Sequence, residues 1–252
     1  MRKRLRALIL LFVCCCAMTV CASAEGNILK VGLNYGSNAL SSANLQNEIG
    51  SGYLVGWYDE VTREFVYVGS LTDTKITMKV FDKCHVQIDE TFNTFEEANH
   101  VASQFNTGFV AYINNAYRVR VNSFDTREQA EGAAGTYTTW YDLYGGVHPF
   151  FGTAVTPSAT AVTVVNTTTE KVLFQFDCSG AKALGILPNG GADGTLTWFK
   201  GYKWYGGFEY RRSTGGDINV INVVNIDDYI KGVLPYEMST SWPLEALKAQ
   251  AV

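Results

Sequence analysis

The residue best suited to acid–base chemistry is Glu237, near the C-terminal end of the sequence. Its neighbours Pro235, Tyr236, Met238 and Trp242 are apolar or aromatic. Apolar surroundings disfavour an ionised carboxylate, so we expect them to raise the pKa of Glu237 toward that of a useful proton donor. We also predict that Tyr236 and Trp242 contact the substrate. The structural alternative is an ordinary surface glutamate in a loop.

Two helices are predicted to lie on either side of Glu237. Asn225 is a favourable cap for the first helix, and Gly232 is a suitable residue to end it. The second helix is expected to start at Pro243, because the first helical position needs no amide hydrogen. The apolar residues that follow Pro243 recur at helical spacing, so this helix has one face to bury.

Three other acidic residues near Glu237 have structural explanations. Asp227 and Asp228 fall in the first turn of the first predicted helix, where negative charge is favoured. Glu245 falls at the third position of the second helix if Trp242 is its cap, and a glutamate there reaches back to a free amide. Glu237 has no such capping role, which leaves it as the candidate acid.

The C-terminal fifth of the chain carries a long ungapped signature. It begins with the motif Tyr202-Lys203-Trp204-Tyr205-Gly206-Gly207. A spaced pattern follows, made of Asn225, Tyr229, Gly232-Val233, Pro235 and Glu237-Met238. The signature ends with the continuous run Glu245-Ala246-Leu247-Lys248-Ala249-Gln250-Ala251-Val252. With these motifs, residues 202–252 resemble the stage II sporulation protein D family, also called the amidase-enhancer family. Glu237 matches the catalytic glutamate of that family, and no cofactor or metal ion is expected.

The resemblance implies lytic cleavage of bacterial cell-wall glycan. In that reaction the bond between N-acetylmuramic acid and N-acetylglucosamine is broken without water, and an anhydro ring closes. One carboxyl group serves as acid and then as base, so the reaction needs no second carboxylate. Two alternatives stay open: a noncatalytic protein that recruits or stimulates a cell-wall amidase, and a plain glycan-binding envelope protein. The family continues beyond the position of Val252, so we expect an incomplete catalytic domain here and activity only in a longer parent protein.

A short internal repeat lies in the middle of the chain. Residues 92–98 are matched by residues 124–130, and each copy contains a capping box, Thr94 with Glu97 and Thr126 with Gln129. Each copy is therefore predicted to start a helix. Alternating strands lie before and between the helices, and a last strand is expected near Tyr141. The order is strand, helix, strand, strand, helix, strand.

Residues 84–145 resemble the sporulation-related repeat (SPOR) domain, a small module that binds peptidoglycan glycan strands stripped of their peptides. The resemblance rests on two pseudo-repeated halves, each with Phe-Asn/Asp-Thr before its helix. Tyr112, Tyr117 and Arg118 on the predicted hairpin are candidates for sugar contact, because aromatic faces and guanidinium groups suit ligands rich in hydroxyl groups. The alternatives are ordinary sheet packing for these residues and a ferredoxin-like module with another role.

Outside this module the sequence predicts strands and turns, with a long loop over residues 36–52. The fold class is α+β: a mostly antiparallel, incomplete catalytic-type domain with an inserted βαββαβ ferredoxin-like module. The expected parts are a signal peptide (1–24), an N-terminal β part of the sporulation protein D-like domain (25–83), the SPOR-like module (84–145) and the main domain (155–252). Residues 28–40 look like the start of the main domain, which would make the module an insertion.

The first residues are typical of a secretory signal: four basic residues, a short apolar run and Ala22-Ser23-Ala24. We therefore expect cleavage after Ala24 and a location in the bacterial cell envelope, outside the cytoplasmic membrane. The chain has 24 Asp+Glu against 20 Lys+Arg, and four of the basic residues belong to the signal, so nucleic acid is not an expected partner. Beyond the signal, Cys84 and Cys178 either form one disulfide or remain buried thiols.

Overall fold

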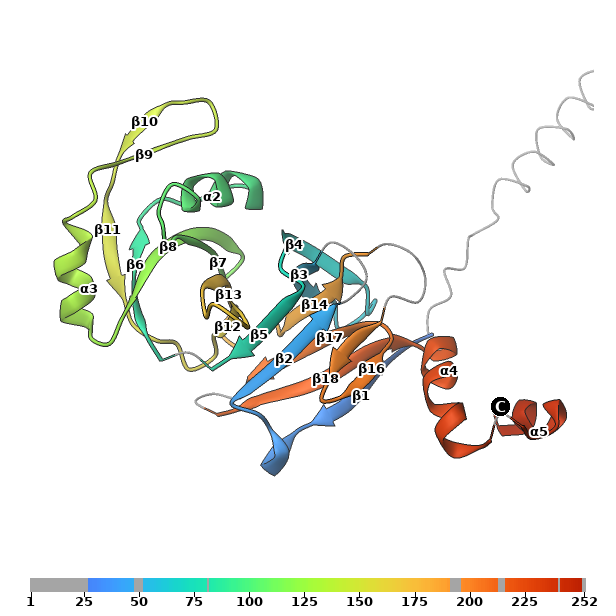
Figure 1. Cartoon of the computed structure of the whole chain (residues 1–252). Helices are drawn as coiled ribbons and strands as arrows, with labels where there is room; N and C mark the ends of the chain where they lie inside the picture. The colour runs from blue at the N-terminus through green and yellow to red at the C-terminus, as the bar shows by residue number, and fades with distance from the viewer. Residues whose placement is uncertain are drawn as a thin grey trace, which may run out of the picture.

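The computed structural model describes residues 27–47, 52–80, 82–190, 196–212, 216–239 and 241–250. The predicted signal peptide 1–24, its cleavage site and Val252 lie outside the described residues. Within the described ranges, no helix combines the length and the apolar character needed to cross a membrane. The fold is α+β and consists mostly of sheet, as predicted, with two large sheets and four α-helices in these ranges (Figure 1).

The first sheet has six strands, and all neighbours in it are antiparallel. In spatial order the strands are β1 (Ile28–Asn34), β18 (Ile218–Asn225), β17 (Gly207–Arg212), β14 (Leu184–Pro188), β3 (Tyr53–Tyr58) and β4 (Phe65–Leu71). The first strand of the chain thus pairs with the last one, and Ile28 lies opposite Asn225. This pairing brings the N-terminal part of the described chain to the start of helix α4 (Ile226–Glu237).

The second sheet has ten strands. In spatial order they are β11 (Gly152–Val155), β6 (Cys84–Ile88), β8 (Ala116–Phe124), β7 (Phe109–Ile113), β13 (Val172–Asp177), β12 (Val162–Asn166), β5 (Lys75–Lys79), β2 (Ser42–Asn47), β15 (Thr197–Phe199) and β16 (Tyr202–Trp204). Neighbours are antiparallel except β7 and β13, which run parallel. The loop predicted over residues 36–52 is wrong in part, because it contains β2, where Ala43, Leu45 and Asn47 alternate into the interior.

Residues 84–155 follow the predicted order of elements with one correction. Helices α2 (Phe95–Ala102) and α3 (Arg127–Ala134) lie where the repeat predicts them, and β6, β7 and β8 pair antiparallel in the order β6-β8-β7. The last strand is not the one near Tyr141, because β9 (Thr139–Tyr141) pairs with β10 (Val147–Pro149) in a separate hairpin. The strand that pairs with β6 is β11, beyond the expected end of the module at residue 145.

The two helix starts show why the local prediction holds. The Thr126 side chain accepts a hydrogen bond from the Gln129 amide (3.3 Å), and the Gln129 side chain accepts one from the Thr126 amide (3.3 Å), which completes the capping box. In the first copy, Thr94 accepts from the Glu97 amide (3.1 Å), and Glu97 accepts from the amide of Asn93 rather than from that of Thr94. Both arrangements satisfy free amides at the helix start.

A single apolar cluster joins the two sheets. The indole of Trp57 on β3 stacks on Tyr112 of β7, with ring centroids 5.8 Å apart. The backbone of Gly69 on β4 lies so close to Phe95 of α2 that a Cβ atom at residue 69 would lie 2.3 Å from the ring. The repeat-bearing segment is therefore packed against the six-stranded sheet, and its own sheet continues into β13.

Candidate functional site

Helix α4 follows β18 directly and starts as predicted. The Asn225 side chain accepts a hydrogen bond from the Asp227 amide (2.9 Å), and the Ile226 amide donates to the carbonyl of Asn27 (2.7 Å). Asp227 and Asp228 lie in its first turn. The predicted stop at Gly232 is wrong, because the helix continues to Glu237. Pro235 lies inside the last turn of the helix, where it removes one backbone amide donor.

A pocket of about 270 Å³ lies between α4, strand β16 of the ten-stranded sheet and strand β18 of the six-stranded sheet. Aromatic side chains contribute much of its lining. The lining residues are Tyr202, Lys203, Trp204, Tyr205, Asn222, Val224, Asp228, Tyr229, Gly232, Val233 and Tyr236. Those from α4 are spaced three or four residues apart and so share one face of the helix. The pocket offers flat apolar rings together with a carboxylate and an amine.

The wall opposite α4 is held by hydrogen bonds that link the Tyr-Lys-Trp-Tyr-Gly-Gly motif to residues outside it. The Trp204 indole donates to the carbonyl of Phe199 (3.2 Å), which orients the ring. The buried Asn222 side chain donates to the carbonyls of Tyr205 and Gly207 (2.9 Å each). Gly207 is required by packing, since a Cβ atom there would lie 1.8 Å from the Tyr58 hydroxyl oxygen. These contacts explain why the motif has this composition.

Asp228 is a site residue that sequence reasoning assigned only to the helix start. Its carboxylate borders the pocket and accepts a hydrogen bond from Lys231 (2.8 Å). The hydrogen bond from Lys231 to Asp228 and the negative charge of Asp228 raise the pKa of the Lys231 amine. The i,i+3 spacing of the two residues is the sequence signal that could have revealed the pair. A carboxylate beside aromatic rings is a suitable acceptor for the hydroxyl groups of a ligand.

Glu237 is the last residue of α4, directly after the pocket-lining Tyr236. Its side chain is exposed and accepts a hydrogen bond from the Gln250 amide group (2.8 Å). The predicted apolar enclosure is not formed by the described residues: Tyr236 is 81% exposed and Trp242 53% exposed. The sequence prediction failed here because side chains that are adjacent in sequence point in different directions at the end of a helix.

Glu245 lies in the first turn of α5 (Leu244–Gln250), close to the predicted start at Pro243. Its carboxylate accepts from Lys248 (2.8 Å), so the predicted reach back to a free amide is replaced by an i,i+3 ion pair. The side chain is 83% exposed, and such a pair contributes little to stability. Glu245 therefore has a local partner and is a suitable control for Glu237.

The three candidate sugar contacts of the SPOR-like segment have other partners. Tyr112 is 7% exposed and lies between Trp57 and Phe176, whose ring centroid is 5.9 Å away. The Tyr117 hydroxyl donates to the carbonyl of Val68 (2.8 Å), and Arg118 donates to two loop carbonyls. Tyr112 is thus a core residue in this structure and not a surface for a ligand, because the module packs against β3 and β13.

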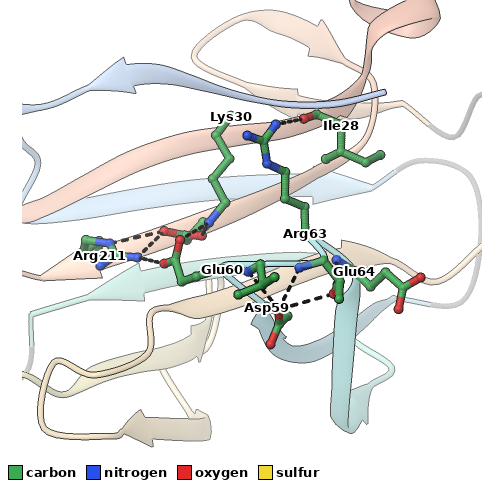
Figure 2. Close-up of polar contacts among 10 residues, drawn as sticks. Ile28, Lys30, Asp59, Glu60, Arg63, Glu64 and Arg211 are labelled. Carbon is green, nitrogen blue, oxygen red and sulfur yellow. Dashed lines mark hydrogen bonds and ion pairs between the residues drawn. The ribbon is translucent and has the colours of Figure 1, made fainter. Parts of the chain in front are cut away.

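A second group of charges lies across the six-stranded sheet (Figure 2). Glu209 is 1% exposed and accepts hydrogen bonds from Lys30 (2.7 Å) and Arg211 (3.0 Å). Both cations also contact Glu60, in the turn between β3 and β4. Sequence reasoning missed this group, although a glutamate between Phe208 and Tyr210 on a buried strand is a signal of it. Because Lys30 reaches Glu209 across β18, the group ties β1 to the rest of the sheet.

Two further observations concern possible ligands of the protein. Cys84 and Cys178 are both buried and both free, so the disulfide alternative is wrong in this structure. Within the described ranges, no three His, Cys, Asp or Glu side chains gather in a way that could hold a metal ion. The pocket beside α4 is the arrangement in these ranges that best suits a ligand, and Glu237 directly follows its lining residue Tyr236 in the chain.

Comparison with known proteins gives matches of limited extent. Residues 214–252 match the family model SpoIID, described as Stage II sporulation protein. An uncharacterized protein of Brachyspira hyodysenteriae is 73% identical over 33 residues, which are 13% of this chain and 9% of that relative. The matched part therefore spans less than a tenth of the relative's length. No solved structure gives a significant match. Helix α4 and Glu237 fall inside the segment that matches the sporulation family.

Proposed function

We propose that this protein acts on the bacterial cell wall during sporulation, as a peptidoglycan lytic transglycosylase with Glu237 as its acid and base. The observation that carries the proposal is the aromatic pocket along α4, whose lining residue Tyr236 directly precedes Glu237 in the segment similar to the sporulation family. Sugar rings bind to flat aromatic faces, and pockets with a few polar groups orient them. Tyr236, which adjoins Glu237 in the chain, and Trp242 are both exposed and contact the glycan in this proposal.

The chemistry requires one carboxyl group. Protonated Glu237 donates its proton to the glycosidic oxygen between N-acetylmuramic acid and N-acetylglucosamine as the C–O bond breaks. The resulting carboxylate then accepts the proton of the muramic acid's own hydroxyl as that oxygen attacks and closes the anhydro ring. Glu237 thereby regains its proton, and no water is consumed. Gln250 supports this role because its amide group donates to Glu237 and holds the side chain in place.

A second candidate function is stimulation of a cell-wall amidase without catalysis. It is favoured by the exposure of Glu237, since a general acid is normally enclosed by the site. In this version the same pocket binds glycan strands, and the exposed face of α4 contacts the amidase. The protein belongs outside the cytoplasmic membrane in either version, which is where the glycan lies.

The repeat-bearing segment is, in this proposal, a ferredoxin-like SPOR module inserted into the main domain and bound to glycan strands. Its antiparallel strand order β11-β6-β8-β7 supports the topology, with α2 on β7 and β8 and α3 on β6 and β11. The pairing of β1 with β18 supports the insertion, because strands on either side of the segment share one sheet. Arg118 and Tyr117 are the less buried of its three proposed contacts.

Incubation of the purified natural protein with peptide-free glycan strands, followed by mass analysis, tests the activity. Release of products with anhydro-muramic acid ends is expected. Products with reducing muramic acid ends would show that the protein hydrolyses the glycan, and would contradict the lytic transglycosylase proposal. If no product forms and the protein accelerates a purified amidase, the second candidate function takes its place.

A further inference from the structure

Hairpin β9–β10 stands apart from both large sheets. It forms a two-stranded sheet of its own and projects from the end of the molecule that carries α2 and α3 (Figure 1). In its register, Trp140 lies opposite His148 and Tyr141 lies opposite Val147. Opposite residues share a face of a hairpin, so one face carries Trp140 with His148 and the other carries Tyr141 with Val147.

The first face attaches the hairpin to the rest of the fold. Trp140 is 5% exposed, packs edge-on against Phe92 and stacks on His148 with ring centroids 4.2 Å apart. The side chain of Gln104, just after α2, both donates to the Tyr141 carbonyl (2.6 Å) and accepts from its amide (2.9 Å). The hairpin is therefore held in one position relative to α2.

The second face and the turn are apolar and open to solvent. Tyr141 is 49% exposed, Leu143 46%, Tyr144 95% and Val147 61%. Residues 139–151 contain no Lys or Arg, and Asp142 is their only acidic residue. Exposed strands and hairpins usually carry charged side chains, which prevent unwanted association. Four exposed apolar side chains on one projection therefore mark a binding surface.

Several polar groups of the turn are paired within it. One oxygen of Asp142 accepts from the amides of Tyr144 and Gly146 (2.8 Å each), and the other contacts His148 Nε2 (2.9 Å). The Asp142 amide donates to the Gly146 carbonyl (3.0 Å), and the Gly145 amide donates to the Asp142 carbonyl (3.1 Å). Since unpaired backbone groups make transfer out of water costly, these hydrogen bonds lower the cost of moving the turn into a less polar layer.

We propose that the tip of this hairpin inserts into the interfacial layer of a phospholipid bilayer. A projecting tip is convex, whereas ligands such as sugars need a concave site or groove. Tyr, Leu and Val suit the boundary between headgroups and acyl chains, where tyrosine places its ring in the apolar part and its hydroxyl in water. The absence of basic residues indicates attraction to apolar chains and not to anionic headgroups, so a zwitterionic bilayer is sufficient. This inference does not depend on Glu237 or on glycan cleavage.

Sedimentation of the whole protein with phosphatidylcholine vesicles tests the inference. Weak binding is expected, and it should persist when the ionic strength is raised to about 1 M, where charges are screened beyond about 3 Å. The double variant Leu143→Ser with Tyr144→Ser should lower the partition coefficient by about fivefold or more, because two inserted side chains lose their apolar burial. The matched control is Tyr35→Ser with Val61→Ser, since these residues are 65% and 86% exposed elsewhere. Its binding should equal that of the unchanged protein.

Several outcomes would overturn the inference. The unchanged protein could fail to bind phosphatidylcholine, or both double variants could lose binding equally. Binding restricted to anionic vesicles and abolished by salt would mean electrostatic attraction elsewhere on the surface. Self-association that the hairpin variant removes, with no vesicle binding, would assign the tip to contact between two copies of the chain. Circular dichroism of the hairpin variant should match that of the unchanged protein, because all the substituted side chains are exposed.

Discussion

At the scale of single residues, the candidate acid and its rivals differ in their partners. Glu237 contacts Gln250 on the following helix, whereas Glu245 pairs with Lys248 within its own helix and Asp228 pairs with Lys231. The acid of a lytic reaction must be free to exchange a proton with the substrate. Glu237 meets this requirement best, because its hydrogen-bond donor is a neutral amide and not a cation.

In the full-length parent protein, replacement of Glu237 by Gln should abolish release of anhydro products and leave the fold and glycan binding intact. The change keeps the size of the side chain and removes the proton that the leaving oxygen must receive, which is worth roughly a hundredfold to ten-thousandfold in rate. Product release from peptide-free glycan is the measurement. Glu245→Gln is the control and should stay within a few-fold of the unchanged protein. The reverse pattern, with Glu237→Gln active and Glu245→Gln inactive, would make Glu245 the acid.

A buried histidine should make stability depend on pH. Burial lowers the pKa of His85 from 6.5 to about 4, although its Nδ1 bonds the carbonyl of Asn122 at 2.5 Å. Between these values the unfolded chain binds a proton that the folded chain does not, so the free energy of unfolding rises with pH from about 4 to about 6.5. Across this pH range, His85 changes the free energy of unfolding by at most about 3 kcal/mol.

Urea unfolding at several pH values between those limits measures the effect. The variant His85→Gln should show a smaller slope of unfolding free energy against pH, because glutamine does not titrate. Thr138→Ala serves as the control, since this exposed side chain does not titrate, and it should keep the slope. An equal slope in the unchanged protein and in His85→Gln would assign the pH dependence to carboxyl groups.

At the scale of elements, short-range hydrogen bonds determine where helices start. Both threonine caps and the Asn225 cap lie within three residues of the amides that they bind. Helix ends are less well determined by sequence. Gly232 does not end α4, because the helix continues on the wall of the pocket, where a Cβ atom at 232 would lie 3.9 Å from the ring of Tyr205.

The second cap provides a stability prediction for α3. Thr126→Ala should lower the free energy of unfolding by about 1 kcal/mol, because it leaves the Gln129 amide at the helix start without its acceptor. Thermal or urea unfolding measures the change. Thr138→Ala is the control, since Thr138 is exposed after the helix and should change stability by only a few tenths of a kcal/mol. Equal losses of unfolding free energy in Thr126→Ala and Thr138→Ala would show that the cap makes no specific contribution to stability.

At the scale of the whole molecule, contacts between distant segments hold the candidate site in place. The Tyr-Lys-Trp-Tyr-Gly-Gly motif that walls the pocket packs through Gly207 against Tyr58 of β3. The charges of Figure 2 tie β1 to β17, and β1 lies beside the strand that leads into α4. Removal of either contact is therefore expected to disturb the pocket, although neither contact lies in it.

Gly207→Ala tests this long-range contact. The added methyl group would meet the Tyr58 hydroxyl oxygen, so the free energy of unfolding should fall by about 1–3 kcal/mol. Tyr58→Phe removes that oxygen and should restore more than half of the loss when both changes are combined. Urea unfolding of the two single variants and the double variant gives the coupling free energy between residues 58 and 207. Strictly additive losses would mean that residues 58 and 207 do not interact.

The sequence by itself determined what depends on close neighbours in the chain. The capping boxes predicted both helices of residues 84–155, alternation predicted most strands, and the motifs around Glu237 led to the similarity with the sporulation family. Only the tertiary structure decided which strands become neighbours. The parallel pairing of β7 with β13 joins segments about 60 residues apart. So does the antiparallel pairing of β6 with β11, which takes the place expected for a strand near Tyr141. Tertiary packing also buries Tyr112 against Trp57 of β3 and leaves Glu237 exposed at the end of α4. Local periodicity could not predict either outcome, because it indicates that a face is apolar and carries no information about which distant face will cover it.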